Sequence, residues 1–108
     1  KLGSDVLLAE ATDSKCYDTV VISKAADAML AMSGIEASFV LAKNTQGFIS
    51  ISARSRSKLN VQRIMEELGG GGHFNLAAAQ IKDLSLSEAG EKLTEIVLNE
   101  IKEKEKEE

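Results

Sequence analysis

Four consecutive glycines at positions 69–72 stand directly before His73, the only histidine of the chain, in the segment LGGGGHFNLAAA. Glycine loses more backbone freedom on folding than any other residue, at a cost of roughly 0.5–1 kcal/mol relative to alanine inside regular structure. A run of four therefore needs a compensating gain. Three are available: a turn with positive φ, a very close approach of two backbone segments, or a phosphate held by successive backbone N–H groups.

The run does not match the common phosphate-binding loops. A Walker A loop continues with Lys and then Ser or Thr, and the G-x-G-x-x-G fingerprint follows a strand, whereas this run follows a predicted helix. Gly69 fits the position of a helix C-cap, so Gly70, Gly71 and Gly72 need another explanation. We expect Gly71 to have a positive φ and to lie against a phosphate.

A basic segment, SARSRSKLNVQ at 52–62, precedes the glycines in a chain whose net charge is −4. The overall charge argues against a general nucleic-acid coat, because such proteins bind phosphates through many Lys and Arg side chains. Taken alone, the segment would be a solvated strand end and loop. Its position just before the glycine run favours anion binding instead, and strand alternation points Ser52 and Arg54 to the same side.

The chain has 108 residues, 44% of them hydrophobic, which is enough for one domain with one core. Cys16 is the only cysteine, which excludes an internal disulfide and a cysteine-based metal cluster and suits a reducing compartment. No apolar run is long enough to span a membrane. Because the sequence does not start with Met, we expect a piece of a longer protein.

Hydrophobic periodicity predicts an α/β fold, a small mixed sheet of about four strands with helices packed on it. The first helix is expected to use an apolar side that includes Val20, Val21, Ala25 and Met29. Asn60 is the expected N-cap of the second helix, and Ser85 and Glu88 form a capping box at the start of the last. The predicted elements are strand 6–11, helix 17–34, a hairpin of strands 35–44 and 47–54, helix 59–69, a turn of helix before strand 78–82, a helix from 85, and a solvated, fraying tail at 102–108.

Three segments resemble the DHHA1 domain, the C-terminal substrate-binding half of the DHH phosphoesterases: SARS at 52–55, NVQRIMEELGGGGH at 60–73 and AAAQ at 77–80. The resemblance extends from VLLAEAT to the last helix. RecJ exonucleases and nanoRNase enzymes typically show GGGH, two further residues and Ala-Ala-Gly. A fourth glycine, the longer spacer FNL and Gln80 make this chain look like the GdpP type of cyclic-di-AMP phosphodiesterase.

The resemblance implies that 1–108 is a single substrate-binding DHHA1 domain of an enzyme that hydrolyses cyclic-di-AMP to linear pApA, with the GGGGH loop on the nucleotide phosphates. In the family, a partner domain with the Asp-His-His signature holds two manganese ions. That signature does not occur in this chain. We therefore expect no metal site and no cofactor here, and an inactive fragment when the catalytic DHH domain is missing.

Carried over residue by residue, the resemblance gives His73 a catalytic role at the scissile phosphate. Arg54 and Ser55 would contact phosphate, and the glycines would offer N–H groups and room. The substrate-binding set implied by the resemblance is Ser52, Arg54, Ser55, Asn60, Gly69, Gly70, Gly71, Gly72 and His73.

The implied partners are cyclic-di-AMP or a short oligonucleotide, the DHH domain of the same full-length chain, and a second copy in a homodimer. The parent protein would be anchored in the plasma membrane by N-terminal helices outside this sequence, with the domain on the cytoplasmic face.

Three alternatives stay open. A non-catalytic nucleic-acid-binding module, as at the end of alanyl-tRNA synthetases, is weakened by the net charge of −4 and the aromatic content of 4%. A second alternative is the DHHA1 half of a RecJ-like or nanoRNase-like exonuclease. In a purely structural domain, the glycines would serve close packing alone, and changing Arg54 or His73 would leave ligand binding intact.

Overall fold

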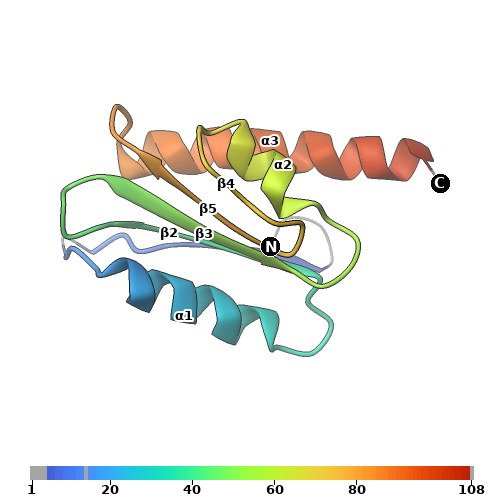
Figure 1. Ribbon diagram of the computed structural model, residues 1–108, viewed down its shortest axis with the longest axis horizontal. Coiled ribbons are helices and arrows are strands. Elements are labelled where there is room, and N and C mark those ends of the chain that lie inside the picture. The colour runs from blue at the N-terminus through green and yellow to red at the C-terminus, as the bar shows by residue number, and fades with distance from the viewer. Residues whose placement is uncertain (1–4, 14, 108) are drawn as a thin grey trace.

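A five-stranded mixed sheet runs through the middle of the computed structural model, which describes residues 5–13 and 15–107 (Figure 1). The strand order is β1-β2-β3-β5-β4, and β1 pairs in parallel with β2 while the other pairs are antiparallel. The strands are β1 (Val6–Glu10), β2 (Ala37–Lys43), β3 (Ile49–Ser55), β4 (Gly71–Gly72) and β5 (Leu76–Ile81). The α/β fold is confirmed, with one strand more than predicted, because two glycines of the run form the edge strand β4.

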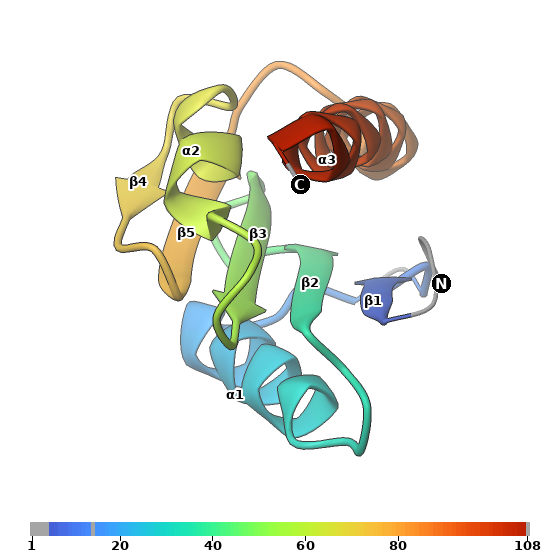
Figure 2. The ribbon, with the colours of Figure 1, turned by 90° about the vertical axis from the view of Figure 1, so that its right-hand side faces the viewer.

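Helices cover both faces of this sheet. Figure 2 shows α1 (Thr19–Leu30) on one face, and α2 (Val61–Glu66) with α3 (Leu86–Glu107) on the other. Local sequence starts each helix: the Asp18 side chain accepts the N–H of Val20, and the Asn60 side chain accepts that of Arg63. At α3, Ser85 Oγ accepts the Glu88 N–H while Glu88 Oε1 accepts the Ser85 N–H, which confirms the predicted capping box.

The main core lies between the sheet and the pair α2 and α3, and includes Phe39, Leu41, Ile51, Met65 and Leu93. A smaller cluster of Ile22, Ala26, Val40 and Ala42 joins α1 to the opposite face. Alternation in β3 follows the prediction, because Ile49, Ile51 and Ala53 join the main core whereas Ser52 bonds to α1.

Helix α1 packs against β2 and β3 and leaves β5 uncovered on its side of the sheet. The burial pattern of β5 reflects this: Ala77, Ala79 and Ile81 are buried in the main core, and the alternate residues are exposed. The uncovered residues are Leu76, Ala78 and Gln80. This part of the sheet is called the open face below.

The structure corrects two predictions about α1. The helix ends at Leu30 rather than at Gly34, which instead lies in the following turn with φ +80°. Val20 and Val21 are 57% and 50% exposed, because the helix buries Ile22 and Ala26. The Arg56 guanidinium, from a distant segment, donates to the carbonyls of Leu30 and Ile35 and holds the chain in this turn.

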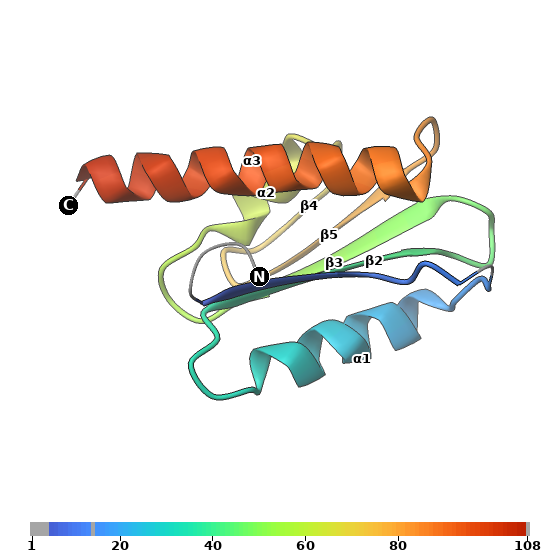
Figure 3. The same ribbon diagram turned by 180° about the vertical axis from the view of Figure 1, so that it is seen from behind.

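The second half of the chain departs from prediction at two places. No turn of helix precedes the last strand; Phe74 and Asn75 form a two-residue connection, and β5 covers 76–81 rather than 78–82. The tail that was expected to fray is helical, since α3 continues to Glu107 (Figure 3), although its side chains are largely exposed as predicted. Glu108 lies outside the described residues.

Candidate functional site

The strand register brings the predicted site residues Arg54 and His73 into one row at an end of the sheet. Arg54 of β3 pairs with Leu76 of β5, and the backbone of Leu76 exchanges hydrogen bonds with that of His73. In the next row on the same face, Ser52 pairs with Ala78, which pairs with Gly71. Residues opposite each other in an antiparallel pair project to the same side, so these rows bound the open face.

The reason for having glycine differs among the four positions of the run. Gly69 has φ +84° and ends the turn after α2. A Cβ at Gly70 would lie 2.1 Å from the Ala78 carbonyl oxygen, and one at Gly72, where φ is +145°, would lie 2.5 Å from that of Leu76. Close approach of β4 to β5 therefore requires both.

Gly71 is the exception within the run. Its φ is not positive, and a Cβ there would meet no atom within 4 Å. The prediction of a positive φ at Gly71 was wrong, because the residue is an ordinary extended member of an edge strand. Neither backbone conformation nor internal packing explains a glycine at this position, which leaves room for an outside group to approach the backbone.

The glycines do not present a row of free N–H groups. The N–H of Gly70 donates to Met65 O at 2.8 Å, and that of His73 donates to Leu76 O at 2.8 Å. In an antiparallel pair, hydrogen-bonded residue pairs alternate with pairs that make no hydrogen bond. Gly71 therefore bonds to Ala78 of β5, whereas the N–H of Gly72 points away from β5 to the free edge of the sheet. A cradle of successive donors, as predicted, is therefore replaced by a strand edge with an outward donor at Gly72.

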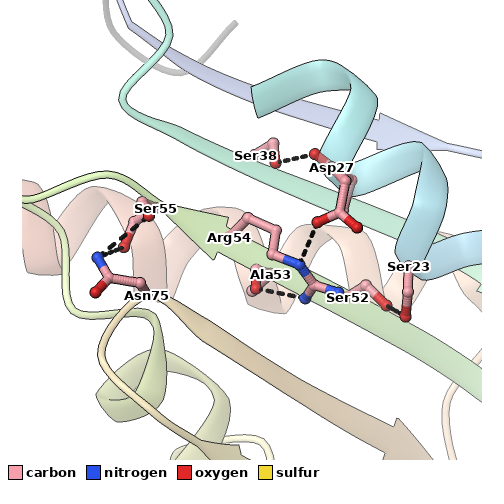
Figure 4. A network of polar contacts seen from close by, with 9 residues as sticks. Ser23, Asp27, Ser38, Ser52, Ala53, Arg54, Ser55 and Asn75 are labelled. Atoms are coloured by element: carbon pink, nitrogen blue, oxygen red, sulfur yellow. Dashed lines mark hydrogen bonds and ion pairs between the residues drawn. The ribbon is translucent and has the colours of Figure 1, made fainter. Parts of the chain in front are cut away.

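Arg54 is held from the helix side of the sheet, as Figure 4 shows. Its Nε donates to Asp27 Oδ1 of α1 at 2.7 Å, and its Nη1 donates to the Ala53 carbonyl oxygen at 3.0 Å. The Arg54 side chain is only 9% exposed, whereas that of Asp27 is 61% exposed. Within the described chain, Nη2 makes no hydrogen bond, so the fixed guanidinium keeps one nitrogen for a ligand.

Ser52 and Ser55 lie at opposite sides of β3. Ser52 Oγ is 3.1 Å from Ser23 Oγ of α1 and is buried beneath that helix. Ser55 donates to the Phe74 carbonyl oxygen at 3.2 Å, on the other face from Arg54. Arg54 and Ser55, both expected to contact phosphate, therefore project from opposite faces of β3, because neighbouring residues of a strand point in opposite directions.

Asn75 fixes the turn that carries His73. Its Nδ2 donates to the carbonyl oxygens of Ser55 and Arg56, at 3.2 and 2.7 Å, and so ties the turn to the end of β3. His73 itself is exposed. The imidazole therefore stands on a short, anchored turn at the rim of the open face.

Three further residues, Asn60, Arg56 and Arg63, have structural partners away from the open face. Asn60 caps α2 and lines a cavity of about 100 Å³ against α3. Arg56 bonds carbonyls at the end of α1, and Arg63 pairs with Glu100 at 3.3 Å. Lys58 of the basic segment lines the same cavity as Asn60, so Arg54 is the cation of that segment that projects to the side of the open face.

The donor set for a metal ion is missing from the described part of the chain. No three His, Cys, Asp or Glu side chains gather there into a cluster that could hold one. Within the same residues, no helix combines the length and apolar character needed to cross a membrane.

Comparison with known proteins gives the family. The family model of the DHHA1 domain matches residues 4–104, nearly the whole chain. The chain belongs to the DHHA1 domain family. The mixed sheet with α1 on one face and α2 and α3 on the other is thus the structure of a DHHA1 domain.

Relatives of this DHHA1 domain are much longer proteins. It is 45% identical over 92 residues to the cyclic-di-AMP phosphodiesterase GdpP of Geobacillus thermodenitrificans, covering 85% of this chain and 14% of that protein. It is 51% identical over 77 residues to the cyclic-di-AMP phosphodiesterase PdeA of Listeria monocytogenes, covering 71% and 12%. A crystal structure of an exopolyphosphatase-related protein from Bacteroides fragilis matches 72% of this chain and 22% of that one, with TM-score 0.58 and 28% identity.

Two residues that the sequence analysis missed shape the site of this DHHA1 domain. Asp27 sets the position of Arg54, and Asn75 sets that of the His73 turn. One sequence signal could have indicated the role of Asp27, because it lies one helical turn after Ser23, on the same side of α1. No local pattern marked Asn75, whose hydrogen bonds reach residues 19 and 20 positions earlier.

Proposed function

We propose that this DHHA1 domain binds the substrate of a DHH-family phosphodiesterase that hydrolyses cyclic-di-AMP to linear pApA. Support comes from relatives at 45% and 51% identity, whose names give cyclic-di-AMP as substrate. The chain spans only 12–14% of those proteins, so the hydrolytic activity belongs to the full-length parent.

The observation that carries the proposal is the row of Arg54, Leu76 and His73 beside Gly71. The Nη2 of Arg54, which has no partner among the described residues, can donate a charge-assisted hydrogen bond to a phosphate oxygen. An imidazole N–H donates to a further oxygen. The space at Gly71 and the outward N–H of Gly72 let a phosphate approach β4 beside His73, while Arg54 lies across β5 on the same face of the sheet.

Each group has a distinct role in this proposal. Arg54, held by Asp27, binds phosphate in the ground state and the transition state alike, so it contributes mainly to affinity. His73, on its anchored turn, meets charge that develops on the reacting phosphate, so it contributes mainly to turnover.

The metal chemistry is assigned to another part of the parent protein. The described residues of this chain do not fit a metal site. A DHH domain of the same full-length chain would hold two manganese ions, and the open face would close on the nucleotide from the other side. The isolated chain is accordingly inactive.

The proposal also places the parent at the membrane through N-terminal helices, with this domain on the cytoplasmic side, and includes a homodimer.

The test measures binding of cyclic-di-AMP to the full-length parent by calorimetry, with manganese withheld so that the ligand is not hydrolysed. Arg54→Ala should weaken binding at least tenfold, as expected for loss of a charge-assisted hydrogen bond of about 1.5–3 kcal/mol. Lys58→Ala is the matched control, because it removes one positive charge from an exposed residue of the same segment.

Equal weakening by the two variants would show a diffuse charge effect and overturn the site. Intact binding in Arg54→Ala and His73→Ala would favour the purely structural alternative. Tighter binding of single-stranded oligonucleotides than of cyclic-di-AMP would favour the exonuclease or nucleic-acid-binding alternatives.

A further inference from the structure

A polar cavity of about 260 Å³ adjoins the open face at the opposite end from Arg54. It lies where the N-terminus of α1 meets the turn between β2 and β3 and the end of β5. The residues that line it are Asp18, Thr19, Asn44, Thr45, Gln46 and Gln80.

Asn44 forms the rigid wall of this cavity. It is 1% exposed, its Nδ2 donates to Ser50 Oγ at 2.7 Å, and its Oδ1 accepts the backbone N–H groups of Gln46 and Phe48. These bonds use the Asn44 amide inside the fold. They also fix the turn that carries Gln46, so the cavity has a defined shape on this side.

The side-chain amides of Gln46 and Gln80 are available to a ligand, since neither makes a hydrogen bond to another described residue. Gln80 is exposed and stands near the end of strand β5 rather than on a loop. The charged group among the lining residues is Asp18, whose Oδ1 accepts the Val20 N–H. A carboxylate repels anions, so the cavity suits a neutral, planar group that carries both donors and acceptors.

The strand register gives the distance between this cavity and the proposed phosphate position beside Gly71. Leu76, Ala78 and Gln80 project from one side of β5, and Ala78 pairs with Gly71. Two residues along a strand span about 7 Å, so Gln80 lies roughly that far from the level of Gly71. This separation is comparable with the distance between a phosphate and the base of the same nucleotide.

We propose that this cavity is a nucleobase subsite and that Gln80 recognises adenine. The proposal rests on the proposed function, because a phosphate beside Gly71 sets where the base falls. A glutamine amide accepts a hydrogen bond from the adenine N6 amino group and donates one to N7. Guanine offers two acceptors, O6 and N7, at the same edge, so the amide oxygen of Gln80 would face an acceptor.

The experiment compares cyclic-di-AMP with cyclic-di-GMP on the full-length parent, again by calorimetry without manganese. Gln80→Leu should weaken cyclic-di-AMP binding by about tenfold, within the range for one bidentate amide–adenine contact, and leave cyclic-di-GMP binding nearly unchanged. Gln62→Leu is the control, because Gln62 lies on α2 across the sheet and, among the described residues, its side chain bonds to Glu66.

The outcomes separate the subsite from the proposed function. An unchanged ratio of the two affinities in Gln80→Leu, with Arg54→Ala still weakening both ligands, would overturn the subsite and leave the proposed function standing. Equal weakening of both nucleotides by Gln80→Leu is one form of that result, since Gln80 would then contact a part common to both ligands. If neither Arg54→Ala nor Gln80→Leu affects binding, the proposed function is wrong, and the subsite that rests on it is wrong as well.

Discussion

Replacing Gly70 by alanine should destabilise the domain, whereas replacing its neighbour Gly71 by alanine should leave the stability nearly unchanged. An alanine Cβ at position 70 would lie 2.1 Å from Ala78 O and 2.7 Å from Ala79 Cα. Both are backbone atoms, so no side chain can rotate away. Carbon and oxygen atoms in contact normally stay more than about 3.3 Å apart, so β4 must move away from β5 by about 1 Å.

That movement stretches the bond from the Gly70 N–H to Met65 O and the ladder between Gly71 and Ala78. Overpacking of this kind costs about 1–3 kcal/mol. For a domain of this size, each kcal/mol lowers Tm by about 4–8 °C, so Gly70→Ala should lower Tm by about 4 °C or more.

Gly71→Ala should change the free energy of unfolding by no more than about 0.5 kcal/mol, because the new methyl group meets no neighbour within 4 Å. The assay is denaturant and thermal unfolding of both variants followed by circular dichroism. Equal stability of the two variants would refute the assignment of close packing to Gly70.

In the parent enzyme, Gly71→Val should fold and lose activity, since its side chain would fill the approach to the strand edge. Full turnover in a folded Gly71→Val protein would contradict this.

Four further outcomes are expected. In the parent enzyme, Arg54→Ala should raise KM for cyclic-di-AMP more than it lowers kcat, and His73→Ala should lower kcat by on the order of 10²-fold; identical profiles for the two variants would contradict the division of roles. Asp27→Asn should raise KM less than Arg54→Ala does and have no effect in the Arg54→Ala background, which a double-mutant cycle measures. Ser85→Ala should destabilise the domain by about 0.5–2 kcal/mol in urea unfolding, with Ser87→Ala, an exposed serine two residues away, as the control. Hydrogen bonds from the Ser85 N–H and Oγ lower the pKa of Glu88 from its usual 4.5. The stability gained from the ionised Glu88 is therefore complete above the unfolded pKa and is lost as the pH falls through the lower folded pKa. The stability difference between wild type and Glu88→Gln should shrink as the pH falls below 4.5, and a difference that grows on acidification would be inconsistent with the capping box.

Local sequence determined where most elements begin and which side of them is buried. Asn60 and the Ser85–Glu88 pair start α2 and α3 through bonds that span three residues. The alternation of apolar and polar residues in β3 sets its two faces. These features follow from contacts between near neighbours, so a single segment contains the information. The family resemblance was likewise carried by short segments, and the match over 4–104 confirmed it.

Tertiary structure decided the arrangement of the site, because its contacts join residues far apart in the chain. The glycine run has no side-chain periodicity that could predict a strand, and β4 exists because β5 offers it a partner. Asp27 and Arg54 are 27 positions apart, so no local pattern could show that α1 would hold the guanidinium. The end of α1 likewise depends on Arg56 from beyond the hairpin. Which cation of the basic segment faces the open face was therefore decided by strand register and helix placement, since only the folded sheet fixes which side each residue projects from.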